Sequence, residues 1–237
     1  MIRFACLIFC ENWLCSSMLR EYFKEIKQFD FETVIIIIYS TFVLLFAVYL
    51  RRVDFLFPGQ GFLNRLIIKG VIYGLSPFLL FFIFNHKPKD FGISFGHFKK
   101  WIKEVFFFYF LMVIILLLVF KFTNLKNVYP LYHKAAHGMN WFLLYQSIHL
   151  FHMFTWEFFF RGFMLFGLEK KFGKASILIQ TIPFAILHYS KPPLEAYGAI
   201  FTGIVLGIMG LRARSFLPCA ILHFLVALTA DILGILL

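Results

Sequence analysis

The chain has 237 residues, of which 61% are hydrophobic and only 15% are charged. Several apolar segments approach the roughly 20 residues that a helix needs to cross a bilayer, so a soluble domain is excluded. The formal net charge of +11 would suggest nucleic-acid binding in a soluble protein, but the lysines and arginines cluster between apolar segments, where they meet anionic head groups. We therefore predict an all-α, polytopic membrane protein that does not bind nucleic acid.

The predicted elements begin with a helix at the membrane interface, because charged residues recur in a helical rhythm within residues 1–32. About seven transmembrane helices follow, and two short spans leave six to eight as the range. We treat residues 1–140 as an N-terminal part and residues 141–237 as a core of four spans, within one integrated membrane domain. The predicted spans cover about residues 33–50, 66–85, 105–120, 141–168, 175–188, 194–212 and 216–237.

The distribution of positive charge predicts the orientation. With seven spans, fourteen lysines and arginines fall on the N-terminal side of the membrane and seven on the other. The positive-inside rule then places the N-terminus in the cytoplasm. We expect an integral protein of the cell membrane, inner or plasma, with the lipid bilayer as its surroundings.

A stripe of small residues marks the sixth predicted span. Ala199, Gly203 and Gly207 recur every four residues, and Gly210 lies nearby. This spacing lets another helix approach the backbone closely, so it predicts helix packing.

Glu157 and Arg161 are the most unusual residues, because they place opposite charges inside a long apolar segment. A charge near the middle of a membrane helix is costly unless it is paired or hydrated. One interpretation is a structural ion pair at the i, i+4 spacing. The other is a functional site, because His188, His223 and Asp231 fall within or at the ends of later spans. Such residues could supply a base for water, a partner that orients it and a donor for an oxyanion.

Three motifs follow one another in this part of the chain: Trp-Glu-Phe-Phe-Phe-Arg-Gly at 156–162, Phe-Ala-Ile-Leu-His at 184–188, and His223. Together they resemble the CPBP family, which includes the type II CAAX prenyl endopeptidases (CAAX proteases), Abi proteins and bacteriocin-processing enzymes. The family signature is Glu-Glu-xxx-Arg, then Phe-xxx-His, then His-xxx-Asn. The resemblance covers roughly residues 141–237.

This resemblance implies a hydrolase, an intramembrane endopeptidase that cleaves a peptide or protein substrate at the membrane. Glu157 would be the general base, with His188 and His223 as its partners and Arg161 holding Glu157 ionised. If the enzyme is a metalloprotease, Glu157, His188 and His223 would instead bind a divalent metal such as zinc. Asp231 would be a replacement polar group.

The chain departs from the family signature at two positions. Trp156 occupies the position of the first glutamate, and Ala227 occupies that of the asparagine. Losing one oxyanion donor typically lowers a rate by about 10² to 10³. The alternative to an enzyme is therefore a catalytically silent CPBP-like scaffold, an immunity or regulatory protein that binds a membrane partner. We interpret His149 and Glu195, two further polar residues near these motifs, as helix contacts.

Overall fold

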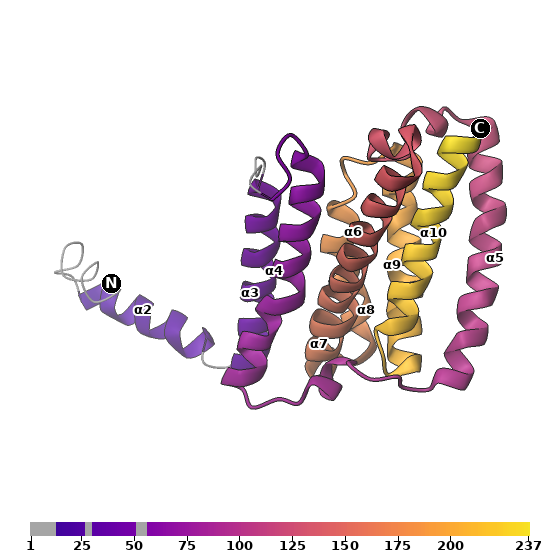
Figure 1. Ribbon diagram of the computed structural model, residues 1–237. Helices are drawn as coiled ribbons and strands as arrows, with labels where there is room; N and C mark the ends of the chain where they lie inside the picture. Colours follow the sequence, from indigo (N-terminus) through magenta and orange to yellow (C-terminus); the bar gives the residue numbers. More distant parts are fainter. Residues whose placement is uncertain (1–12, 27–29, 51–55) are drawn as a thin grey trace.

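The structure is a computed structural model that describes residues 13–26, 30–50 and 56–237, and the regular elements of these residues are all helices (Figure 1). The predicted all-α class is confirmed. The first part of the predicted interfacial helix lies outside the described residues. The long helices are α2 (Trp13–Ile26), α3 (Phe31–Tyr49), α4 (Gly61–Ile83), α5 (Phe98–Phe122), α6 (Met139–Glu157), α9 (Pro193–Ala213) and α10 (Leu217–Leu236). Shorter elements are the π-helical segment η4 (Phe158–Met164), α7 (Leu165–Phe172), α8 (Ser176–Ile186) and the 3₁₀ turns η1 (Pro88–Phe91), η2 (Leu125–Asn127), η3 (His133–His137) and η5 (Gly173–Ala175).

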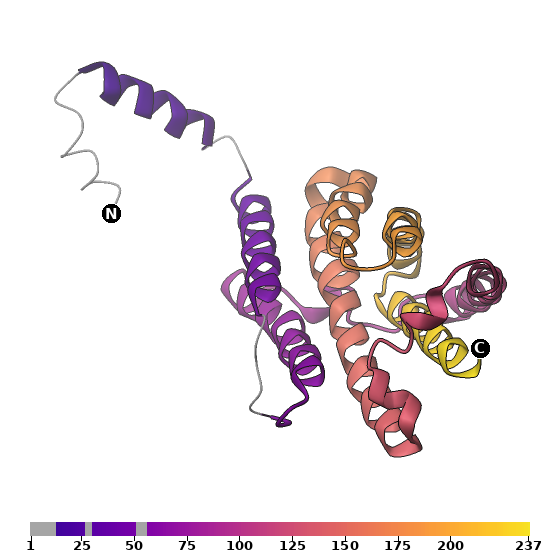
Figure 2. The ribbon, with the colours of Figure 1, turned by 90° about the horizontal axis from the view of Figure 1, so that it is seen from above.

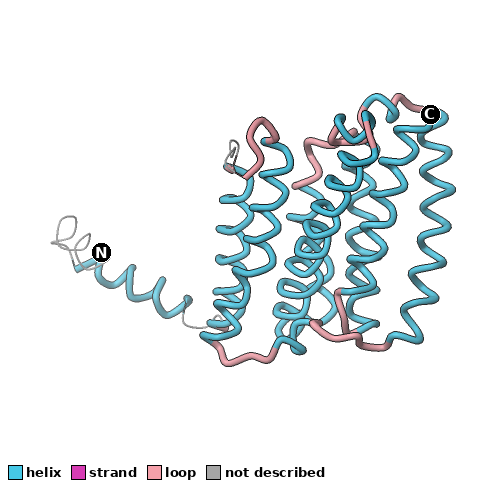
Figure 3. Tube along the Cα trace, viewed as in Figure 1, coloured by secondary structure: helices cyan, strands magenta, loops and turns pink. Residues whose placement is uncertain are grey.

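The helices α3 to α10 run side by side in a bundle, and α2 extends away from it (Figures 1 and 3). The view from above shows α3 and α4 as a pair on one side and α5 on the opposite edge (Figure 2). Between them, α6, η4 and α7 follow one another without a break and pack against α4, α8 and α10. The segment that runs from Glu157 to Arg161 therefore lies inside the bundle.

Helix length and composition identify candidate membrane spans among the described residues. Five described helices, α3, α4, α5, α9 and α10, are long and apolar enough to cross a bilayer. Helix α6 has 19 residues but is too polar to be counted with these five. Helix α8 has only 11 residues and is too short to cross a bilayer. The count of seven is thus not confirmed. Polar residues such as Gln146, His149 and His152 lower the hydropathy of α6, and α8 is too short because it ends at Ile186.

Local sequence explains where several helices begin and end. Asp30 caps α3, because its carboxylate accepts hydrogen bonds from the Thr33 N–H at 2.9 Å and the Thr33 hydroxyl at 2.6 Å. These bonds hold the pKa of Asp30 below its usual value. Helix α9 has Pro193 in its first turn, where the missing N–H costs no hydrogen bond, and it ends at Arg214 in a left-handed conformation.

The largest hydrophobic cluster surrounds η4, in which all seven residues are buried. Phe159, Phe160 and Phe163 have no exposed surface and contact one another or the aromatic rings of α4 and α8. The abundant phenylalanines of the sequence therefore form the packed interior as well as the surface that faces lipid. This packing holds Arg161 at a defined place within η4.

The small-residue stripe of α9 packs against α8, which confirms the predicted close approach. A Cβ atom added to Gly203 would lie 2.7 Å from Thr181 Cγ2, and one added to Gly207 would lie 2.8 Å from Ile177 Cγ2. Larger residues would push α8 and α9 apart. The stripe thereby helps to place the end of α8, where Phe184 and His188 lie.

Candidate active site

Glu157 and Arg161 form a buried ion pair. Glu157 is the last residue of α6, Arg161 lies in η4, and neither side chain is exposed. The Arg161 Nη1 atom donates to Glu157 Oε1 at 3.1 Å. The predicted i, i+4 pair is therefore confirmed. A π-helical turn at such a place is rare, and such turns are frequent at functional sites.

His223 contacts the same carboxylate from α10. Its Nδ1 atom lies 2.6 Å from Glu157 Oε1, although the two residues are 66 positions apart in the sequence. An ionised carboxylate can only accept, so Nδ1 carries the hydrogen and Nε2 of the neutral ring carries a lone pair. The His223 side chain is 20% exposed, whereas Glu157 is fully buried. The pair thus presents an imidazole, backed by a carboxylate, towards the more open side.

His188 lies beside His223, two residues beyond the end of α8. The centroids of the two rings are 6.4 Å apart and their planes differ by 23°. His188 Nδ1 lies 2.8 Å from the carbonyl oxygen of Phe184, which can only accept, so its Nε2 also carries a lone pair when the ring is neutral. The structure therefore places His223 against Glu157, and His188 beside His223.

Trp156 closes one side of this cluster. Its indole ring contacts His188 edge to face, with 6.2 Å between the centroids, and also packs on Phe184. The indole Nε1 atom is buried and has no hydrogen-bond partner among the described residues. At the position of the first glutamate of the signature, the chain thus has an apolar indole ring whose Nε1–H group is unpaired among the described residues.

Asp231 lies in a separate polar cluster. Its carboxylate accepts from Gln146 Nε2 at 2.9 Å and from the Leu131 N–H at 3.3 Å, and it lies 3.7 Å from His149 Nδ1. Asp231 is eight residues beyond His223 on α10, which corresponds to about 12 Å along the helix. The structure does not bring Asp231 to Glu157. Sequence reasoning missed Gln146, whose signal was an amide inside an otherwise apolar segment.

The connection between α5 and α6 is tied to the start of α9. The Tyr129 hydroxyl donates to Glu195 Oε2 at 2.5 Å, and Lys191 Nζ lies 3.1 Å from Glu195 Oε1. Burial, together with the adjacent Glu195 carboxylate, raises the pKa of Tyr129, so the hydroxyl keeps its proton. Glu195 is therefore a contact between elements, as interpreted from the sequence.

The three candidate metal ligands do not fit a shared ion in this arrangement. Glu157 lies on the Nδ1 side of the His223 ring, while the lone pair that a metal would need is on Nε2. Within the described residues, no three His, Cys, Asp or Glu side chains are placed to hold a metal ion together. The geometry instead matches a carboxylate that orients an imidazole.

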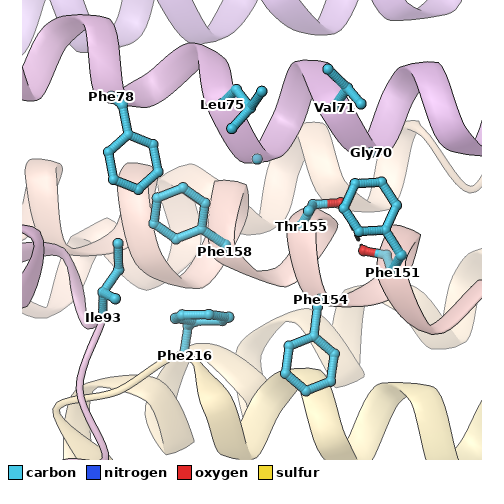
Figure 4. Close-up of a pocket in the computed structure, with 11 residues that line it drawn as sticks. Gly70, Val71, Leu75, Phe78, Ile93, Phe151, Phe154, Thr155, Phe158 and Phe216 are labelled. Atoms are coloured by element: carbon cyan, nitrogen blue, oxygen red, sulfur yellow. Dashed lines mark hydrogen bonds between the residues drawn. The ribbon is translucent and has the colours of Figure 1, made fainter.

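An apolar pocket of about 360 Å³ lies between α4 and α6 (Figure 4). Its one polar side chain is Thr155, whose hydroxyl donates to the carbonyl groups of its own helix. The pocket contains neither Glu157 nor the two histidines of the cluster. Its lining residues are Gly70, Val71, Gly74, Leu75, Phe78, Ile93, Phe151, Phe154, Thr155, Phe158 and Phe216.

Residues 138–229 match a family described as type II CAAX prenyl endopeptidase Rce1-like. This range includes Glu157, Arg161, His188 and His223. Searches of curated proteins and of solved structures gave no match.

Proposed function

We propose, from the membership of residues 138–229 in the CPBP family of type II CAAX endopeptidases, that this protein is an intramembrane peptidase. The observation that carries the proposal is the contact between Glu157 Oε1 and His223 Nδ1 at 2.6 Å, with His188 beside it. The substrate is a peptide or protein presented at the membrane, and its bond is cleaved by hydrolysis.

His223 is the general base in this proposal. Its Nε2 atom takes a proton from water, and the resulting hydroxide attacks the carbonyl carbon of the peptide bond. The Glu157 carboxylate stabilises the imidazolium and holds the ring in the required tautomer, as the acid does in a carboxylate–histidine dyad. The imidazolium then returns its proton to the leaving amine.

Glu157 thus acts through His223 and not directly on water. Its Oε1 atom is shared by Arg161 and His223, and the whole side chain is buried. Arg161 keeps the carboxylate ionised. His188 Nε2 accepts the second hydrogen of the water and so orients it, because its Nδ1 atom is engaged by the Phe184 carbonyl.

One observation favours a second candidate function, a catalytically silent scaffold that binds a membrane partner as an immunity or regulatory protein would. Trp156 stands at the first glutamate of the signature and Ala227 at the asparagine. Both changes remove groups that the signature assigns to catalysis. This candidate requires that the intact chain cleaves no peptide, whereas the enzyme requires that cleavage depends on His223.

Cleavage in proteoliposomes tests the proposal. The probe is a fluorogenic peptide with a farnesylated cysteine near its C-terminus, compared with the same peptide without the lipid. His223→Gln is expected to lower kcat by about 10² to 10⁴, the contribution of a general base. His149→Gln is the matched control, because His149 is a buried histidine on α6 that lies 3.7 Å from Asp231 in the separate polar cluster. Equal cleavage by the wild type and by a folded His223→Gln variant would overturn the mechanism.

A further inference from the structure

Arg161 poses a problem of charge compensation. Its guanidinium is fully buried, and within the part of the chain that the structure describes its one hydrogen bond is the Nη1 contact to Glu157. The Nε and Nη2 atoms have no hydrogen-bond partner among the described residues. A buried cation normally uses its donors fully, because each unpaired donor loses its hydration without compensation. Another group must therefore stabilise this guanidinium.

The ring of Phe184 supplies that group. The Arg161 Cζ atom lies 3.9 Å from the Phe184 ring centroid, closer than any other cation lies to a ring among the described residues. The negative face of an aromatic ring attracts a cation, and the attraction is stronger where water is excluded. Phe184 is 1% exposed, so the contact is dry.

The backbone of the same residue holds His188. Helix α8 ends at Ile186. In a continued α-helix the His188 N–H would donate to the Phe184 carbonyl, but here it donates to the Ala185 carbonyl. The Phe184 carbonyl instead accepts from His188 Nδ1 at 2.8 Å. The His188 ring also packs on the Phe184 ring, with 4.6 Å between the centroids.

We propose that Phe184 is a positioning residue that couples the buried Arg161 to both histidines. Its ring fixes the guanidinium that holds Glu157, and Glu157 orients His223. Its carbonyl and ring fix the tautomer and the plane of His188. This proposal rests on the proposed peptidase function for its kinetic consequence, but its structural part concerns the hydrogen positions on the two histidines and is independent of activity.

Two changes at position 184 separate the electrostatic role from simple packing. Phe184→Leu keeps an apolar side chain but removes the π-face. Replacement of Phe184 by 3,4,5-trifluorophenylalanine keeps the shape of the ring and weakens its attraction for a cation. The matched control is Phe160, which is also fully buried but lies 5.8 Å from Arg161 Cζ, and whose carbonyl accepts from the Leu165 N–H. The same two changes are made at that position.

The first readout is the nitrogen spectrum of histidine-labelled full-length protein in detergent, with the His188 and His223 signals assigned by their loss in His188→Gln and His223→Gln. We expect the wild type to show both rings with the hydrogen on Nδ1. Both Phe184 variants keep the backbone carbonyl and therefore the His188 tautomer, but they are expected to shift the His223 signal towards a mixture of tautomers, because the guanidinium that holds Glu157 is less firmly fixed. The Phe160 variants are expected to keep both wild-type signals. An unchanged His223 signal in the folded trifluoro variant would overturn the proposal.

The second readout is cleavage of the farnesylated peptide. Both Phe184 variants are expected to lower kcat by roughly tenfold to a hundredfold, as displacement of a catalytic group by about 1 Å does, with KM nearly unchanged. The same loss in the Phe160 variants would show a packing effect and overturn the proposal. If the wild type cleaves no peptide, the proposed function fails, while the histidine spectrum still decides the role of Phe184.

Discussion

His149 and Asp231 face each other across α6 and α10, with His149 Nδ1 3.7 Å from Asp231 Oδ2. They repeat the contact between Glu157 and His223 in reverse, because here α6 supplies the imidazole and α10 the acid. Each residue lies eight positions from its counterpart on the same helix. The two helices are antiparallel. The second pair therefore lies about two turns from the first, towards the N-terminus of α6 and the C-terminus of α10.

Removal of the Asp231 carboxylate is expected to destabilise the bundle. Asp231→Ala leaves the Leu131 N–H and the Gln146 amide without their acceptor, at about 1–3 kcal/mol for each unsatisfied group. Asp231→Asn retains one acceptor oxygen and should cost less. Unfolding of the purified protein in detergent micelles measures both effects. Equal stability of Asp231→Ala and the wild type would contradict the role of this carboxylate.

The ion pair in η4 is expected to show strong coupling in a double-mutant cycle. Glu157→Gln and Arg161→Met each leave a buried charge without its partner, so each should cost about 3–5 kcal/mol of unfolding free energy. The double variant removes both charges and should lose less than the sum, with a coupling of about 1–3 kcal/mol. Unfolding in detergent gives the four values of the cycle. Strict additivity would show that the two side chains do not stabilise each other.

Gly96 should not tolerate a side chain. Its φ is +53°, and an added Cβ atom would lie 1.9 Å from the Ala213 carbonyl oxygen. We expect Gly96→Ala to cost more than the roughly 1–2 kcal/mol of a left-handed conformation alone, because the loop must also move away from α9. Gly59→Ala is the matched control, since Gly59 also has a positive φ but its Cβ would meet nothing within 4 Å. Thermal unfolding compares the two variants, and equal losses would contradict the predicted clash.

The first turn of α3 should become less stable in acid. Hydrogen bonds from Thr33 lower the pKa of Asp30 in the folded state below its value in the unfolded chain. The ionised cap therefore stabilises the folded protein above the unfolded pKa, and this stabilisation is lost as the pH falls through the folded pKa. Amide hydrogen exchange of residues 31–34 is expected to accelerate, relative to the intrinsic rate, below about pH 4. Asp30→Asn keeps a capping side chain that does not titrate and should abolish this dependence. A dependence that persists in the variant would assign it to another group.

Hydropathy and motifs predicted much of this structure, for reasons that are visible in single residues. Glu157, His188 and His223 could be grouped because ionisable residues are rare inside apolar segments and here recur in the order of the family signature. The small residues of α9 predicted its packing because their spacing reports a close approach directly.

Other features depend on contacts that spacing does not encode. Helix α8 ends shortly after Pro183, where the His188 N–H donates to Ala185 three residues back. The Phe184 carbonyl is therefore free to accept from the His188 ring. The partners of Asp231 come from a loop and from α6, and only the folded chain brings Leu131 and Gln146 to it. For the same reason, the sequence could make Glu157 a candidate for the site but could not show that its carboxylate lies on the Nδ1 side of His223.

The π-helical segment Phe158–Met164 also sets the rotation of α7 relative to α6 about their shared helix axis. Each residue added to or removed from an α-helix rotates everything beyond it by about 100°. Before the segment, Glu157 faces His223 on α10, while after it Glu169 bonds to Arg214 at the end of α9. A single-residue deletion within η4 would therefore leave α6 and α7 folded but rotate one relative to the other, so that Glu157 and Glu169 could not both reach their partners. The chain length of this segment, as much as its chemistry, is what keeps both contacts available at once.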